Sequence, residues 1–167
     1  MAHCQITTDW KDDSMTFWDK FFSNEVMISA IVGWTVAQAL KTIIDCALNK
    51  NFSPERLVGS GGMPSSHSAT VCALATSAGT CFGVESFEFA ICFVFASVVM
   101  YDAIGVRQET GKQAKLLNLI MEQDLFKLNN EHRQEQLKEL VGHTPLQVLA
   151  GAILGIILSV LVHQFYV

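Results

Sequence analysis

The fold is decided by residues 146–167, LQVLAGAILGIILSVLVHQFYV, a stretch of 22 residues without any Asp, Glu, Lys or Arg. A helix needs about 20 apolar residues to cross the hydrocarbon core of a bilayer. Residues 67–84 are also free of these charges, residues 89–106 carry only Asp102, and the shorter stretch 26–40 carries none. The pattern therefore predicts four transmembrane helices.

The whole chain fits this prediction. It has 167 residues, about one domain, of which 50% are hydrophobic and 16% charged. We expect an all-α, polytopic membrane helical bundle, a single membrane domain over 25–167, with interfacial amphipathic helices. The spans are expected near 25–45, 67–84, 87–106 and 145–166. A soluble all-helical bundle is the alternative, and the strength of the hydropathy pattern argues against it.

The segments outside the spans are amphipathic. Residues 1–24 are acidic and aromatic, do not resemble a cleaved signal, and predict a short interfacial helix over 13–22. Residues 107–142 carry apolar residues at helical spacing, which predicts one or two helices on the membrane surface. These helices either cover a site or, as we prefer, simply bridge two spans.

Charge predicts the orientation. Nine of the 11 Lys and Arg residues fall between 41 and 56 or between 107 and 138, on one side of the four-span arrangement. The positive-inside rule places that side in the cytoplasm and both termini outside. The chain is thus expected to be an integral membrane protein whose basic face is cytoplasmic.

Two motifs stand at the starts of predicted spans. Residues 61–69, GGMPSSHSA, combine free amide groups, hydroxyls and the imidazole of His67 at a helix N-terminus, where anions bind. Residues 142–147, GHTPLQ, contain an N-cap, a first-turn proline and Gln147 in a capping box, which leaves His143 unexplained. Capping likewise explains Ser65 or Ser66, but it does not explain His67.

Alternating span directions bring three titratable side chains to the basic face. His67 begins the second span, Asp102 lies near the end of the third, and His143 precedes the fourth. Two imidazoles, a carboxylate and nearby cations indicate phosphoryl chemistry. An ion pair of Asp102 with Arg107 or Lys112 is the structural alternative for that carboxylate.

A metal site is the competing interpretation. The sequence shows no tight His/Asp/Glu cluster, so no metal and no cofactor are expected. The five cysteines have no C-x-x-C spacing, and their odd number argues against a disulfide framework or a zinc site. We interpret them as small packing residues.

Three spaced motifs resemble those of a known family: 61–69 GGMPSSHSA, 101–114 YDAIGVRQETGKQA and 141–145 VGHTP. They are similar to the small divergent branch of the type 2 phosphatidic acid phosphatase and vanadium haloperoxidase superfamily, often labelled acid phosphatase/haloperoxidase-related. The resemblance runs from about residue 26 to residue 160.

The resemblance implies a membrane-embedded phosphatase that acts on a lipid phosphate without a metal. His143 would be the nucleophile that forms a phosphohistidine, and His67 the general acid. Ser65 and Ser66 would bind phosphate. The superfamily aspartate that supports the nucleophile aligns with Gln147, which can orient an imidazole but cannot stabilise it by charge; Asp102 is a candidate substitute.

The superfamily's usual Lys and Arg motifs are missing. The candidate replacements as phosphate ligands are Arg56, Arg107, Lys112 and Lys138. These departures leave two alternatives open: a non-catalytic relative that binds or transports an anionic lipid or phosphorylated ligand, and a structural or assembly protein of the membrane.

The expected partners are membrane lipids and a lipid phosphate, and no nucleic acid. The motifs Ala75-x-x-x-Gly79-x-x-x-Gly83 and Gly151-x-x-x-Gly155 allow helices to approach closely. Such motifs are used both for packing between helices of one chain and for contacts in a homodimer, so they do not distinguish the two.

Overall fold

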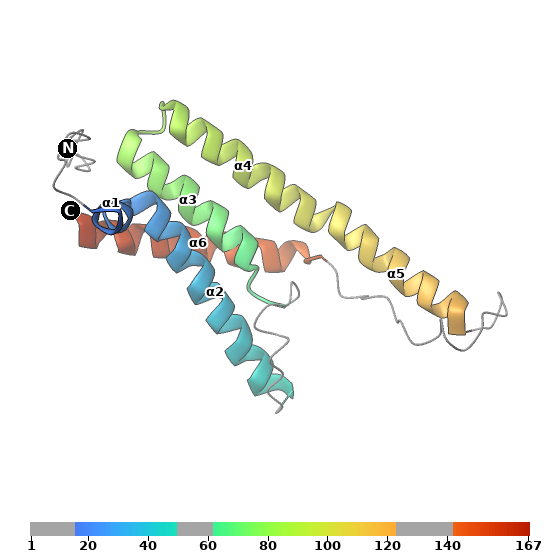
Figure 1. The fold of residues 1–167 in the computed structure, drawn as a ribbon. Helices are drawn as coiled ribbons and strands as arrows, with labels where there is room; N and C mark the ends of the chain where they lie inside the picture. The colour runs from blue at the N-terminus through green and yellow to red at the C-terminus, as the bar shows by residue number, and fades with distance from the viewer. Residues whose placement is uncertain (1–15, 50–61, 123–141) are drawn as a thin grey trace.

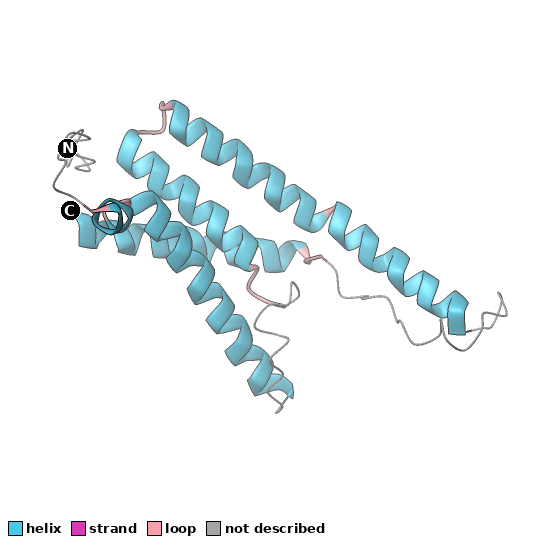
Figure 2. Ribbon diagram, viewed as in Figure 1, coloured by secondary structure: helices cyan, strands magenta, loops and turns pink. Residues whose placement is uncertain are grey.

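The computed structural model describes residues 16–49, 62–122 and 142–167, and within these ranges every regular element is a helix (Figures 1 and 2). The expected all-α class is therefore confirmed. The helices are α1 (Phe17–Phe22), α2 (Glu25–Asn49), α3 (Ser66–Phe82), α4 (Phe87–Ile104), α5 (Val106–Glu122) and α6 (Pro145–Tyr166).

Side-chain caps fix where these helices begin. The hydroxyl of Ser65 accepts from the Ser68 amide at the start of α3, and that of Ser86 accepts from the Phe89 amide at the start of α4. Thr144 forms a capping box with Gln147 at the start of α6. These bonds satisfy backbone donors that have no partner within the helix, so short local sequences determine the helix starts.

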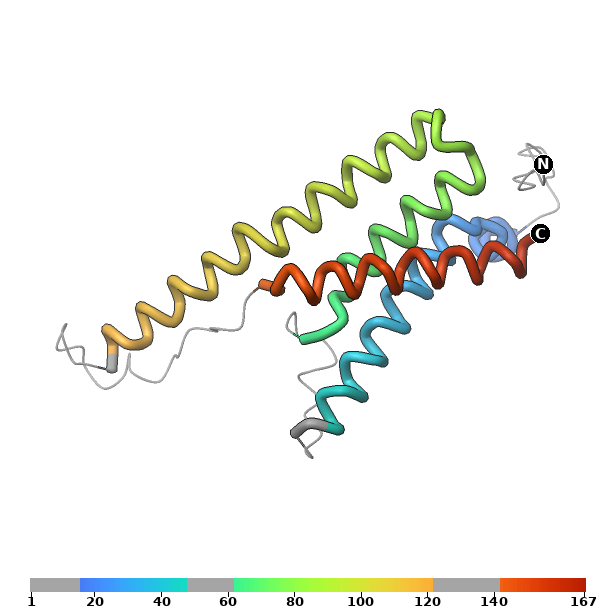
Figure 3. Tube along the Cα trace, turned by 180° about the vertical axis from the view of Figure 1, so that it is seen from behind, coloured from blue at the N-terminus to red at the C-terminus, as the bar shows by residue number. Residues whose placement is uncertain are grey.

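Helix α3 is the centre of the bundle and packs against α2, α4 and α6 (Figures 1 and 3). Most of its buried residues are Ala or Ser, and these small side chains allow neighbouring backbones to come close. A small apolar cluster around Val71 and Cys72 joins it to Ala96 of α4.

The closest approach is between α3 and α6. A Cβ added at Gly151 would overlap the carbonyl oxygen of Ser65, and one added at Gly155 would overlap that of Ala69. On α2, a Cβ at Gly33 would lie 3.0 Å from the same Ala69 oxygen. Glycine is thus required for α6 to lie directly on the backbone of α3.

Three runs are long and apolar enough to cross a membrane: Glu25–Ala47, the run Phe87–Met121 that includes α4 and α5, and Pro145–Tyr166. Helix α3 has 17 residues, so a fourth span at 67–84 stays a prediction. Large apolar side chains on α2, α4 and α6 are exposed, among them Phe93, Val98 and Ile157. Soluble proteins rarely expose contiguous apolar faces of this kind, whereas acyl chains cover them.

Two amphipathic elements accompany the bundle. Helix α1, with its exposed Phe17 and Trp18, is held to the end of α6 because the hydroxyl of Tyr166 donates to the Phe22 carbonyl over 2.6 Å. Helix α5 covers the first half of the connection 107–142, and residues 123–141 lie outside the described part of the chain.

The α3–α6 contact generates a first prediction. Gly155→Leu should lower the free energy of unfolding by roughly 3 kcal/mol, the upper end of the range for overpacking, because backbone atoms cannot yield as side chains do. Thermal unfolding in detergent measures the loss. Ala90→Leu on the exposed face of α4 is the matched control, and an equal effect of both variants would contradict the assigned packing.

Candidate functional site

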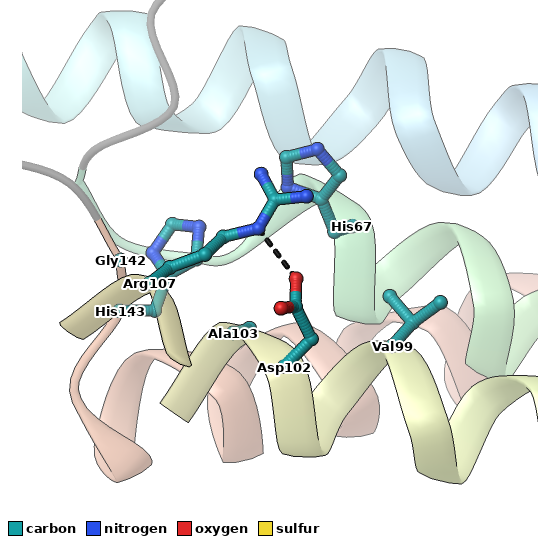
Figure 4. A pocket seen from close by; sticks show the side chains of 7 residues that line it. All are labelled: His67, Val99, Asp102, Ala103, Arg107, Gly142 and His143. Carbon is teal, nitrogen blue, oxygen red and sulfur yellow. Dashed lines mark hydrogen bonds and ion pairs between the residues drawn. The ribbon is translucent and has the colours of Figure 1, made fainter. Parts of the chain in front are cut away.

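A pocket lies where α3 begins, α4 ends and the turn before α6 crosses them (Figure 4). Two backbone hydrogen bonds hold this junction: the His143 amide donates to the Ala103 carbonyl over 3.0 Å, and the Ser65 amide donates to the Gln147 carbonyl over 3.1 Å. The lining residues are His67, Val99, Asp102, Ala103, Arg107, Gly142 and His143.

The two histidines that the sequence singles out line the same pocket. Their ring centroids are 6.2 Å apart and the rings are inclined by 59°. His67 is exposed, whereas His143 is only 3% exposed. The pair therefore offers one imidazole in contact with the surroundings and one that is sheltered.

Hydrogen bonds determine which nitrogen of His143 carries the proton. The Gln147 Oε1 atom accepts from the Thr144 amide over 3.1 Å, which identifies it as the oxygen. Because Nδ1 of His143 lies 3.2 Å from the same oxygen, Nδ1 must be the donor. Nε2 therefore carries the lone pair, and it is buried without a hydrogen-bond partner among the described atoms.

The surroundings of His143 favour the neutral imidazole. Burial is the main cause that lowers its pKa from the usual 6.5. The hydrogen bond to Gln147 acts in the opposite direction, and the charges of His67, Lys41 and Arg107 lower the pKa further. Near neutral pH the side chain is thus an uncharged base whose Nε2 lone pair is sheltered inside the protein.

The turn that presents His143 depends on Gly142. Its φ of +96° lies in the left-handed region, and an added Cβ would lie 2.5 Å from the Gln108 amide nitrogen. Only glycine meets both conditions, so Gly142 lets the chain pass directly against the first turn of α5 before it enters α6, with His143 at the pocket.

Asp102 pairs with a cation rather than with His143. Nε of Arg107 donates to Asp102 Oδ2 over 2.6 Å, and both side chains are partly exposed (Figure 4). The neutral Gln147, and not a carboxylate, is the residue that orients His143. Asp102 instead holds Arg107 at the rim of the pocket.

Lys41 is a cation that sequence reasoning assigned only to topology. It is 4% exposed, its aliphatic chain lies against Gly62, and its charge acts on His143. The signal available in the sequence was a lysine one turn from the polar Gln38 and Asp45 near the end of a span. The positive charge of Lys41 reaches both histidine rings and therefore adds to the attraction for an anion at this end of the bundle.

Three further predicted site residues, Ser65, Ser66 and Lys112, are not among those that line the pocket. Ser65 is fully buried and its hydroxyl is engaged with Ser68 in capping α3. Ser66 is buried in the first turn of α3. Lys112 is exposed and pairs with Glu109 over 2.7 Å. Arg56 and Lys138 lie outside the described residues.

The pocket is small. Its volume of about 20 Å³ is close to the minimum that holds one water molecule. A phosphoryl group would therefore enter only with movement of the half-exposed Arg107, whose side chain forms the open side together with Asp102. Arg107 is placed to follow an anion inward because it is half-exposed and pairs with a carboxylate at the protein surface.

Comparison with known proteins identifies the family of this chain. The model of the divergent PAP2 family matches residues 22–158, and the chain belongs to that family. It is 33% identical over 156 residues to the uncharacterized membrane protein YuiD of Bacillus subtilis (strain 168), an alignment that covers 88% of this chain and 99% of the relative. No solved structure matches the chain.

The lowered pKa of His143 predicts how stability depends on pH. The folded state prefers neutral His143, so the unfolded chain takes up the proton first as the pH falls below about 6.5. His143 therefore contributes stability above that pH, and the contribution is lost on acidification. His143→Gln should flatten the decline of the unfolding temperature between pH 7.5 and pH 5. Parallel curves for the two proteins would contradict the assignment.

Proposed function

We propose that this chain is a membrane-embedded phosphatase that hydrolyses a lipid phosphate through a phosphohistidine intermediate. One observation carries the proposal: the Nε2 atom of His143 is buried, has no hydrogen-bond partner in the described part of the chain, and lies in the same pocket as His67. A buried polar atom without a partner is costly in a purely structural residue. A nitrogen that attacks phosphorus, in contrast, requires a lone pair that no hydrogen bond occupies.

In the first step, Nε2 of His143 attacks phosphorus and the bond from phosphorus to the lipid oxygen breaks. His67, in its protonated form, gives the departing alcohol its proton. In the second step, His67 takes a proton from water, the resulting hydroxide attacks phosphorus, and the N–P bond breaks to release inorganic phosphate. Protons and electron pairs balance over the two steps.

The cations around the pocket suit the charge of the transferred group. Arg107 lines the pocket and Lys41 is buried near enough to act on His143. Their positive charges would hold the phosphoryl oxygens and stabilise the negative charge that they carry in the transition state. Asp102 would keep Arg107 in place through the ion pair at 2.6 Å.

The substrate class follows from the setting of the pocket. It lies at the end of an apolar bundle whose outer faces expose large hydrophobic side chains. A lipid can place its phosphate at this edge while its tails remain among the acyl chains. The positive-inside pattern makes the cytoplasmic face the proposed location.

The test uses purified full-length protein in detergent with a panel of lipid phosphates. His143→Ala should abolish phosphate release. His67→Ala should slow release from lipid phosphates by about 10²–10⁴-fold, the usual contribution of a general acid. Its defect should shrink with p-nitrophenyl phosphate, whose leaving group needs no proton. Equal loss on both substrates would refute the assigned role of His67.

One observation favours a second function, binding of a lipid phosphate without turnover. Gln147 supports His143 with a neutral amide, so the imidazolium formed during catalysis gains no charge partner there. If the protein binds a lipid phosphate without turnover, neither the unmodified chain nor any variant releases phosphate. Binding to phosphatidate vesicles would then survive His143→Ala and weaken with Arg107→Gln or Lys41→Gln.

The identity of residue 147 gives a further prediction. Gln147→Glu keeps the capping box and adds a carboxylate beside His143. Hydrogen bonds to charged groups are stronger by about 1 kcal/mol, which corresponds to a roughly five- to tenfold faster turnover. The acid limb of the pH–rate profile should move to higher pH because the pKa of His143 rises. An unchanged profile would show that residue 147 does not act on the nucleophile.

A further inference from the structure

A second polar cluster lies at the opposite end of the bundle from the histidine pocket. It contains Glu25 at the start of α2, Cys81 near the end of α3 and His163 near the end of α6. Along α3, Cys81 is 14 residues from His67, which corresponds to ~21 Å of helix. The two groups of side chains are therefore separate sites.

Glu25 and His163 are in direct contact, and Ser77 links Cys81 to them. Nδ1 of His163 is 2.8 Å from Oε1 of Glu25, and the Ser77 hydroxyl donates to the same oxygen over 3.4 Å. The Ser77 hydroxyl is also 4.0 Å from the Cys81 sulfur. One carboxylate oxygen, one thiol sulfur and one imidazole nitrogen lie within 4.8 Å of one another.

Burial makes the cluster unusual. Glu25 is only 1% exposed, although it directly precedes the uncharged stretch 26–40 of α2. A carboxylate in such a place is expensive unless it is neutralised or binds a cation. The pairing with His163 explains neither the nearby thiol nor the convergence of three helices on one point.

The layer beneath the cluster is polar as well. Ser29 follows Glu25 by four residues on α2, and Ser159 precedes His163 by four residues on α6, so each lies one turn away on the same face of its helix. Both hydroxyls are fully buried and have no hydrogen-bond partner among the described atoms. On α3 the pair Ser77 and Cys81 repeats the same spacing.

We propose that Glu25, Cys81 and His163 form a binding site for a zinc ion. Zinc takes sulfur, nitrogen and carboxylate oxygen as ligands at about 2.0–2.3 Å in a tetrahedron, which places ligand atoms roughly 3.4 Å apart. The cluster fits after small side-chain rotations that draw the sulfur inward and separate Glu25 from His163. On binding, Cys81 releases its thiol proton, and a water molecule takes the fourth position.

Zinc in this position would connect three helices that start or end at one face of the bundle. Metal binding would therefore stabilise the folded chain, since a site assembled from residues 25, 81 and 163 does not exist in the unfolded state. The inference is independent of the proposed phosphatase activity, because the cluster shares no residue with the histidine pocket.

The experiment uses purified full-length protein in detergent, stripped with EDTA and titrated with Co²⁺ as a spectroscopic probe. We expect a sulfur-to-cobalt charge-transfer band and the visible bands of tetrahedral cobalt, both displaced by Zn²⁺. Cys81→Ser should remove the charge-transfer band. Cys92→Ser, a partly buried cysteine elsewhere in the bundle, is the matched control and should retain it.

A second measurement covers the case in which a variant fails to fold. In the unmodified chain, Zn²⁺ should slow alkylation of Cys81 by at least about tenfold while leaving the rate at Cys92 unchanged. Zn²⁺ should also raise the unfolding temperature, and Glu25→Gln or His163→Gln should weaken zinc binding by at least about tenfold. Equal alkylation rates with and without zinc, or a cobalt spectrum unchanged in Cys81→Ser, would overturn the proposal.

Discussion

The backbone contact between α3 and α6 is the interaction on which the rest of the structure depends. Because Gly151 and Gly155 have no side chains, α6 lies directly on the carbonyl groups of Ser65 and Ala69. This contact brings the Ser65 amide within 3.1 Å of the Gln147 carbonyl and so fixes the start of α6 against the start of α3. The remaining steps involve only residues close to one another in the sequence. The capping box positions the Gln147 side chain, and that side chain selects the tautomer of His143.

The same central helix relates the two ends of the molecule. Helix α3 is built from small residues, so its neighbours approach closely along its whole length. Its N-terminal end carries His67 and its C-terminal end carries Ser77 and Cys81. Each end thus collects polar groups from several helices, whereas the middle is packed with alanine and valine. The bundle thus carries its polar clusters at its two ends, and its apolar middle separates them.

The sequence predicts those parts of this arrangement that rest on local signals or on strict alternation. The starts of α3 and α6 follow from their caps, and alternating span directions bring His67, Asp102 and His143 to one face. The end of α3 differs from the expected residue 84 because Gly83, with φ of +90°, terminates the helix at Phe82. The contact of Gly79 with Phe89 does follow from the small-residue motif.

Contacts between distant residues could not be predicted in this way. The burial of Lys41 depends on how α2 crosses α3. The ion pair of Asp102 with Arg107, five residues away, is by contrast local and agrees with the structural alternative that the sequence offers for this carboxylate. Glu25 is 52 residues from Ser77 and 138 from His163. Ligand spacing along the chain therefore reveals no metal site, and reading the cysteines one by one assigns Cys81 to packing.

The replacement of a carboxylate by Gln147 has a physical consequence for the proposed chemistry. An amide acceptor keeps the proton on Nδ1 of His143 but lends no negative charge, and Lys41 and Arg107 favour the neutral ring. In such a site the neutral imidazole is a good nucleophile, whereas the positively charged imidazolium is poorly stabilised. A phosphate group alters the balance, because its own negative charge offsets both cations as it enters. In this mechanism the substrate itself supplies the charge that an aspartate would otherwise provide, so His143 becomes able to carry positive charge only when an anion is bound.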